Sequence, residues 1–179
     1  ITISGGEPLF LPDVTMELLK AAKEGGLNTA LDTSGFAKWE IIERIAEYVD
    51  VFLVDIKHLD DEKHKKWTGV SNKLILENVK KMARKGINMR LRLPIIHDVN
   101  FWDLGYVRGV VELARELGES VSGIDILPFH SFAEKKYDQL GREYFFKGFR
   151  DLSKEDVEDY EGILTEAGLC EVTVGGMIG

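Results

Sequence analysis

Short apolar runs alternate with amphipathic segments along almost the whole chain. The apolar runs have the length of strands and lie at residues 1–3, 27–31, 51–54, 89–96, 124–127 and 172–174. In the segments between them the spacing of apolar residues predicts helices over residues 12–25, 39–48, 72–85 and 102–117. We also expect a short polar helix over residues 60–67 and a last helix that begins at Ser153, a suitable N-cap. The run at 51–54 is apolar at every position, as expected for a strand buried on both faces of a parallel sheet.

Strands that alternate with helices indicate parallel pairing through helical crossovers. Two architectures have this pattern: a doubly wound open sheet, and a (β/α) barrel that is complete or partial. No low-complexity segment, linker or block of charge divides the chain, so we expect a single domain over residues 1–179.

The sequence supports more detailed predictions for two segments, the first helix and residues 131–150. In the first helix we expect Val14, Leu18, Leu19 and Ala22 to form the buried face. Residues 131–150 show neither a strand nor a helix pattern and include the aromatic residues Tyr137, Tyr144, Phe145, Phe146 and Phe149. We interpret this segment as an irregular excursion whose aromatic side chains either cover the sheet or form a lid.

The composition narrows the class of protein. The net charge is −8, which argues against broad binding to nucleic acid because that needs a basic surface. No stretch approaches the roughly 20 apolar residues of a membrane span. We therefore expect a cytoplasmic protein with neither nucleic acid nor a membrane as its partner. The single cysteine, Cys170, excludes an intrachain disulfide and cannot by itself hold an iron–sulfur cluster.

Ionisable residues follow the predicted strands at their carboxyl ends, where the active sites of both architectures lie. They are Glu7 after Gly5 and Gly6, Asp32 before Thr33, Asp55 with Lys57, Arg92, and His130. Taken singly, each has an ordinary explanation as a turn residue or a solvated surface side chain. Together at one rim they predict a functional site.

The residue types at this rim suit a zwitterionic, amino-acid-like ligand. Glu7 and Asp55 could hold an ammonium group or ribose hydroxyls, whereas the basic side chains Lys57, Arg92 and His130 could hold a carboxylate. The two glycines ahead of Glu7 allow backbone N–H and C=O groups to approach the ligand closely.

Two carboxylates of the rim, Asp32 and Asp55, lie on neighbouring predicted strands. Repulsion between them would raise the pKa of one carboxyl group or recruit a cation to the space between them. Either outcome would couple the two strand ends electrostatically.

Four motifs in order along the chain resemble those of the radical S-adenosylmethionine (SAM) enzymes. They are Gly-Gly-Glu-Pro after the first strand, Leu-Asp-Thr-Ser-Gly, Val-Asp-Ile-Lys and Leu-Pro-Phe-His. Within that superfamily the chain resembles the activating enzymes of glycyl radical enzymes, of which pyruvate formate-lyase activating enzyme is the type. The likeness includes the stretches GVSNK, ENVKKMARKG and RLRLPIIHDVN, spans nearly the whole chain and weakens after about residue 135.

The resemblance implies a fold and a set of ligand contacts. The family fold is a partial (β/α)6 barrel of parallel strands, similar to part of a TIM barrel. By resemblance, the methionine amino group of SAM is bound by Gly5, Gly6 and Glu7, its carboxylate and ribose by Asp55, Lys57 and His130, and Arg92 lies near the cofactor. A monovalent cation beside the methionine carboxylate would be held by Asp32, Thr33 and Asp55.

The resemblance also implies a reaction. In the family a [4Fe–4S] cluster reductively cleaves SAM, and the resulting 5′-deoxyadenosyl radical removes a hydrogen atom from a glycine of a partner enzyme such as pyruvate formate-lyase. The implied partner proteins are therefore a glycyl radical enzyme and an electron donor such as flavodoxin or ferredoxin.

The chain departs from the family pattern in its cysteines. The family holds the cluster with Cys-x-x-x-Cys-x-x-Cys ahead of the Gly-Gly-Glu motif, and this chain lacks that segment. We therefore expect a fragment that lacks the first β/α unit and the cluster and is catalytically incompetent by itself. The strand at residues 1–3 would then have an unpaired edge, which favours dimerisation or aggregation.

Three other functions fit the same residues. One is a radical SAM enzyme that acts on a small molecule, and another is a non-catalytic binding domain descended from the family. The third is a barrel lyase that forms a Schiff base with Lys57, although the nearby Asp55 would tend to keep that amine charged.

Overall fold

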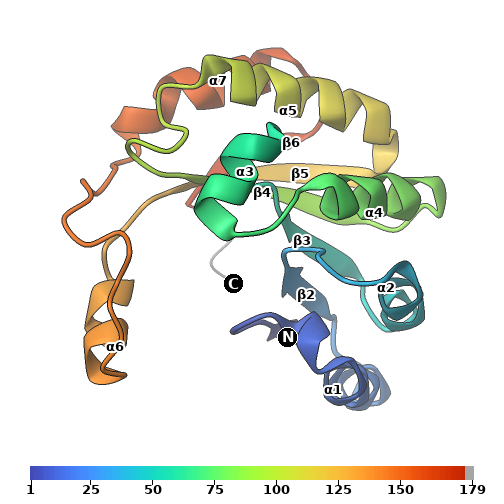
Figure 1. The fold of residues 1–179 in the computed structure, drawn as a ribbon. Coiled ribbons are helices and arrows are strands. Elements are labelled where there is room, and N and C mark those ends of the chain that lie inside the picture. The colour runs from blue at the N-terminus through green and yellow to red at the C-terminus, as the bar shows by residue number, and fades with distance from the viewer. Residues whose placement is uncertain (176–179) are drawn as a thin grey trace.

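The computed structural model describes residues 1–175, and its centre is one sheet of six parallel strands. The strands are β1 (Thr2–Ile3), β2 (Ala30–Thr33), β3 (Val51–Asp55), β4 (Met89–Ile95), β5 (Val121–Pro128) and β6 (Glu171–Val174). They follow one another across the sheet in sequence order, so that β1 and β6 form its two edges (Figure 1). The predicted parallel α/β architecture is confirmed, and the sheet is open.

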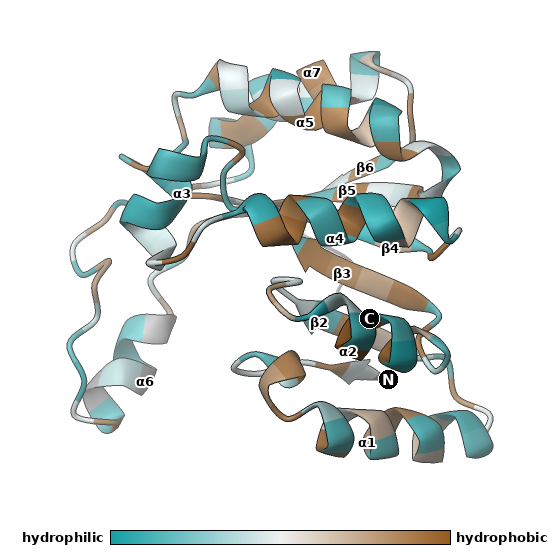
Figure 2. Cartoon of the chain, turned by 45° about the vertical axis from the view of Figure 1, so that its right-hand side comes forward, coloured by the Kyte–Doolittle hydropathy of each residue, from teal (hydrophilic) through white to brown (hydrophobic). Residues whose placement is uncertain are grey.

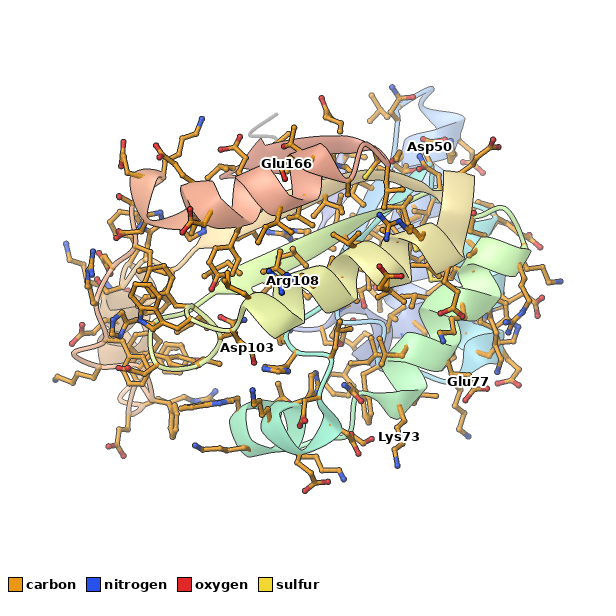
Figure 3. All side chains as sticks on the ribbon, turned by 90° about the horizontal axis from the view of Figure 1, so that it is seen from above. Asp50, Lys73, Glu77, Asp103, Arg108 and Glu166 are labelled. Atoms are coloured by element: carbon orange, nitrogen blue, oxygen red, sulfur yellow. The ribbon has the colours of Figure 1, made fainter. Side chains whose placement is uncertain are left out.

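Helices connect the strands and cover one face of the sheet. They are α1 (Pro12–Glu24), α2 (Trp39–Ala46), α3 (Asp61–Thr68), α4 (Lys73–Arg84), α5 (Leu104–Leu117), α6 (Ala133–Gln139) and α7 (Glu158–Glu166), with short 3-10 turns η1 (Pro8–Phe10), η2 (Gly118–Ser120) and η3 (Glu155–Val157). Five of them, α1, α2, α4, α5 and α7, lie along the outer face, whereas α6 stands apart at the open side (Figure 1). In Figure 3 the charged side chains of Lys73, Glu77 and Glu166 point outward from these helices.

The core lies between the sheet and its helices, which carry brown, apolar bands on their inner sides (Figure 2). Because side chains alternate along a strand, one set faces these helices. That set is fully buried and consists of Leu31, Phe52, Val54, Leu91, Leu93, Ile124 and Ile126. The apolar patterning therefore places the core as expected for most of the chain.

The buried face of α1 differs from the prediction. Leu19 and Ala22 are buried as expected, but Val14 and Leu18 are 56% and 51% exposed. Thr15 takes their place, and its hydroxyl donates to the carbonyl of Pro8 at 2.8 Å. Since α1 lies beside the edge of the sheet and packs mainly on α2 and η1, it buries a narrower face than its apolar stripe suggests.

The excursion at residues 131–150 is also more regular than predicted, because α6 forms within it. Three of its aromatic residues, Phe145, Phe146 and Phe149, pack against Trp67 of α3, with ring centroids 5.9, 6.4 and 6.5 Å away. Phe145 also remains largely exposed to solvent. The segment therefore joins the end of β5 to α3 through an aromatic cluster.

The face of the sheet opposite the helices carries charged residues. Strand register places Asp55, Arg92, Asp125 and Thr173 in one row across β3, β4, β5 and β6. A parallel row, one pleat closer to the amino ends, holds Leu53, Arg90, Gly123 and Glu171. The predicted site residues on these strands therefore belong to a larger polar surface.

Arg90 and Asp125 form a buried ion pair on that surface. Arg90 donates from Nη2 to Oδ1 of Asp125 at 2.6 Å and from Nη1 to Oε2 of Glu171 at 2.8 Å. Thr173 donates its hydroxyl to Asp125 at 2.8 Å. A Cβ at Gly123 would lie 2.3 Å from Cζ of Arg90, so the glycine leaves the space that the guanidinium fills. These hydrogen bonds, above all the one to Asp125, raise the pKa of Arg90.

We expect Asp125→Ala to lower the free energy of unfolding by about 3–5 kcal/mol, because it leaves the Arg90 guanidinium buried without its partner. The control is Glu171→Ala, which removes an acid whose side chain is 59% exposed and should cost less than about 1 kcal/mol. Urea unfolding followed by circular dichroism measures both. Equal losses for the two variants would contradict the assignment of Asp125 as the principal partner.

Candidate functional site

The loop after β1 has a backbone that favours glycine. Gly5 and Gly6 have φ angles of +94° and +58°, in the left-handed region that other residues rarely adopt. No heavy atom lies within 4 Å of a Cβ built on either residue. The requirement for glycine here therefore comes from the backbone angle, and the space beside both residues is open.

Glu7 ties this loop to the loop after β2. Its Oε1 accepts hydrogen bonds from the hydroxyl of Thr33 at 2.6 Å and from the N–H of Leu9 at 3.1 Å. Its Oε2 accepts from the N–H and the hydroxyl of Ser34, at 2.9 and 2.5 Å. Four donors thus hold one carboxylate, and the glycine loop is fixed beside the end of β2. Ser34 was not predicted, and the only signal for it was its place in the Asp-Thr-Ser-Gly turn.

The acidic pair of the rim is bridged by Arg92. Its Nη1 lies 2.6 Å from Oδ1 of Asp32, and its Nε lies 4.0 Å from Oδ1 of Asp55. The hydroxyl of Ser4 donates to the other oxygen of Asp32 at 2.8 Å. The positive group between the two carboxylates is therefore a guanidinium. Burial opposes its charge, but the contacts with Asp32 and Asp55 outweigh burial and raise the pKa of Arg92.

The surroundings of Asp55 disfavour the charged form of its carboxyl group. Burial raises the pKa of its carboxyl group, the nearby Asp32 adds to that effect, and Lys57 and Arg92 oppose it. Lys57 donates from Nζ to Oδ2 of Asp55 at 3.1 Å. The expected raised pKa of one acid in the pair thus falls on Asp55.

These groups line one polar cavity of about 350 Å³ at the carboxyl ends of the strands. All the predicted site residues except His130 line it, namely Gly5, Gly6, Glu7, Asp32, Thr33, Asp55, Lys57 and Arg92. We call it the polar cavity. His130 lies outside it, exposed after β5, with its ring stacked on Phe132 at 5.4 Å between centroids.

The polar cavity fits SAM but the chain does not fit an iron–sulfur cluster. Acidic and basic side chains face the cavity together, as a zwitterionic methionine group requires, and two glycines leave backbone exposed to it. By contrast, the only cysteine of the chain, Cys170, is half-buried just before β6, at the end of the strand opposite the cavity. Among residues 1–175 no cluster of three or more His, Cys, Asp or Glu side chains is arranged to hold a metal ion.

Comparison with known proteins identifies the family. Residues 1–108 match the model of the Radical SAM superfamily. The chain belongs to the radical SAM superfamily. A domain of pyruvate-formate lyase-activating enzyme from Bacteroides vulgatus has a similar crystal structure, with a TM-score of 0.80, 28% identity and 98% of both chains covered. The expected fold, a partial radical SAM barrel, is confirmed.

Several curated relatives of this radical SAM chain are named as activating enzymes. The choline trimethylamine-lyase activating enzyme of Oleidesulfovibrio alaskensis is 40% identical over 92% of this chain and 53% of its own length. The trans-4-hydroxy-L-proline dehydratase activating enzyme of Clostridioides difficile is 35% identical over 98% of this chain and 58% of its own length. The chain thus spans about half the length of these relatives.

None of the helices in residues 1–175 has the length and apolar character needed to cross a bilayer.

The raised pKa of Asp55 gives a prediction with a definite sign. In the folded state the carboxyl group of Asp55 prefers to be protonated. The stability that the folded chain gains from this preference is complete below the pKa of the group in the unfolded chain, about 3.9, and is lost as the pH rises through its pKa in the folded chain. The stability of Asp55→Asn relative to the parent chain should therefore increase as the pH rises from about 3 to about 7. Denaturant unfolding at several pH values measures this difference.

Asp61→Asn is the matched control with the opposite sign. Hydrogen bonds from Ser71 and Lys65 lower the pKa of Asp61 to about 2. The contribution of Asp61 to the stability of the folded chain is therefore present above the pKa of this group in the unfolded chain, and it is lost as the pH falls toward about 2. Parallel pH profiles for the two variants would contradict the assignment of Asp55 as the acid with the raised pKa.

Proposed function

We propose that this chain is the SAM-binding barrel of an activating enzyme that generates a glycyl radical on a partner enzyme. The observation that carries the proposal is the assembly of eight predicted site residues around one polar cavity, in a chain 40% identical to a named activating enzyme. The likeness of the motifs to the glycyl-radical-activating family supplies the reaction class.

The proposed contacts follow from charge and backbone geometry. The methionine ammonium would meet the carbonyl groups of Gly5 and Gly6 and the negative charge of Glu7, whose four hydrogen bonds hold it in place. The methionine carboxylate would meet Lys57 and Arg92, which also line the polar cavity.

Three roles in the proposal require rearrangement or added groups. His130 would contact the ribose only after leaving its stack on Phe132. A monovalent cation at Asp32, Thr33 and Asp55 would have to compete with the Arg92 ion pair. The radical chemistry needs cysteine ligands beyond the one in this chain, so we propose the activity, and the flavodoxin or ferredoxin that feeds it, for a longer protein that contains this barrel.

A radical SAM enzyme that acts on a small molecule is the second candidate. It is favoured by a further cavity of about 460 Å³ beside the polar cavity, a size within the usual range of small-molecule sites. The Schiff-base lyase has less support, because Lys57 is held in an ion pair with Asp55, whereas Schiff-base formation needs a free amine.

The test is an anaerobic assay of the full-length protein with its cluster reconstituted, SAM, a reductant and the glycyl radical enzyme encoded beside it. We expect 5′-deoxyadenosine and an electron paramagnetic resonance signal of a glycyl radical on the partner. Formation of 5′-deoxyadenosine without a radical on any partner protein would favour the small-molecule enzyme.

Lys57→Met should weaken SAM binding by about 10- to 100-fold, because it removes a charge-assisted hydrogen bond to the methionine carboxylate. Lys80→Met is the matched control: both side chains are 39% exposed and both lysines pair with an acid, Asp55 at 3.1 Å and Glu116 at 2.9 Å. Calorimetric titration of the full-length protein with SAM measures both. Equal affinities for the two variants would remove Lys57 from the proposed site.

A further inference from the structure

A second cavity, of about 460 Å³, adjoins the polar cavity, and we call it the apolar cavity. Its walls come from the loop after β2, from α3 and α4, and from the segments that follow α3 and β4. The apolar side chains that form most of them are Phe36, Trp67, Val70, Ile75, Ile96 and Val99. Phe146 closes the cavity from the excursion after β5, where its ring packs against Trp67.

Several polar groups on these walls are already bonded within the protein. Glu7, Ser34 and Lys57 lie at the border with the polar cavity, and the buried Nε2 of His58 has no hydrogen-bond partner among the described residues. His64 places Nδ1 2.8 Å from the carbonyl of Val70, and Thr68 donates its hydroxyl to the carbonyl of His64 at 2.8 Å. Asn100 donates to the carbonyl of Pro94 at 2.9 Å and accepts from the N–H of Ile96 at 2.8 Å. Away from His58 and the border with the polar cavity, an occupant would meet mainly apolar walls, so the cavity favours an apolar group.

The two cavities share a border. Glu7, Ser34, Lys57 and Pro94 line both of them. A group seated in the apolar cavity would therefore lie directly beside a ligand in the polar cavity. Any molecule that delivers a reacting atom to the polar cavity can place a neighbouring group in the apolar one.

We propose that the apolar cavity binds a bulky apolar side chain of the partner protein, within two residues of the glycine that loses its hydrogen atom. This inference rests on the proposed function, which requires that glycine to reach the polar cavity. Consecutive Cα atoms are about 3.8 Å apart, so a side chain one or two residues away can cross the shared border. The adenine of SAM is a poorer occupant because its polar edge needs several hydrogen-bond partners, whereas Nε2 of His58 is the one buried polar side-chain atom on the described walls that lacks a partner.

The experiment measures binding of short peptides to the full-length protein with its cluster and SAM, without reductant. Each peptide has one central glycine in a serine-rich chain, with alanine, leucine or phenylalanine placed in turn at the two positions before and the two positions after it. At one position we expect the larger side chain to raise affinity at least about tenfold over alanine, from the additional apolar area that it buries. A flat series at all four positions would overturn the proposal.

Val70→Trp fills the apolar cavity from a loop, and the backbone contacts of Val70 remain available to His64 and Thr68. It should abolish the size preference of the peptide series. Val14→Trp is the matched control, since Val14 lies exposed on α1 and does not line either cavity; it should keep the preference. An unchanged preference in Val70→Trp, or a loss of SAM affinity as large as the loss of peptide affinity, would overturn the proposal. Because binding is read without turnover, the answer holds whether or not the glycyl radical assay succeeds.

Discussion

Two arginines on β4 place positive charge on a face of the sheet that parallel architectures usually fill with apolar side chains. Arg90 and Arg92 point to that face together because side chains alternate along a strand. Each arginine then needs acids from neighbouring strands within a few ångströms. Register supplies them: Asp125 and Glu171 for Arg90, Asp32 and Asp55 for Arg92. Every carboxylate that β2, β3, β5 and β6 direct to this face pairs with one of these two arginines.

The two arginines nevertheless have different surroundings. Arg90 contributes to the stability of the fold, whereas Arg92 lies at the candidate functional site. Arg90 and Asp125 are almost wholly buried and saturate each other with hydrogen bonds. Arg92 lies one pleat closer to the carboxyl ends than Arg90, and together with Asp55 it lines an open cavity, where Asp55 keeps a raised pKa despite two basic neighbours. Polar groups whose interactions are incomplete at a cavity are typical of binding sites, where a ligand completes them. The Arg90–Asp125 pair holds the strands together, and the Arg92–Asp55 group remains available at the cavity.

The sequence allowed the parallel fold and most of the polar cavity to be predicted, since both follow from local signals. Apolar runs set the strands, and in a parallel sheet the residues after each strand must meet at one edge. The Arg90–Asp125 pair escaped prediction because it depends on which residues of β4 and β5 lie in register, which no local pattern reveals. The exposed side of α1 escaped for a similar reason: amphipathic spacing shows which residues share a face, but not how much of that face a neighbour covers. His130 follows β5 as predicted, yet its direction depends on the excursion, where Phe132 offers it a stacking partner.

The division between a polar and an apolar cavity also bears on how related proteins can share a cofactor and differ in their partners. The relatives of this chain are named for activating a lyase, a dehydratase and a decarboxylase. We propose SAM as the ligand of the polar cavity in this chain, and that ligand would constrain the charges and the glycine backbone there. The apolar cavity shares its border residues Glu7, Ser34, Lys57 and Pro94 with the polar cavity, but most of its other walls come from loops and helices beyond the strand ends. Substitutions there change volume and shape without disturbing the ion pairs of Asp32, Asp55 and Arg92. Under the proposed function, selectivity for a partner would therefore vary in the apolar cavity while the geometry beside the shared border stays fixed.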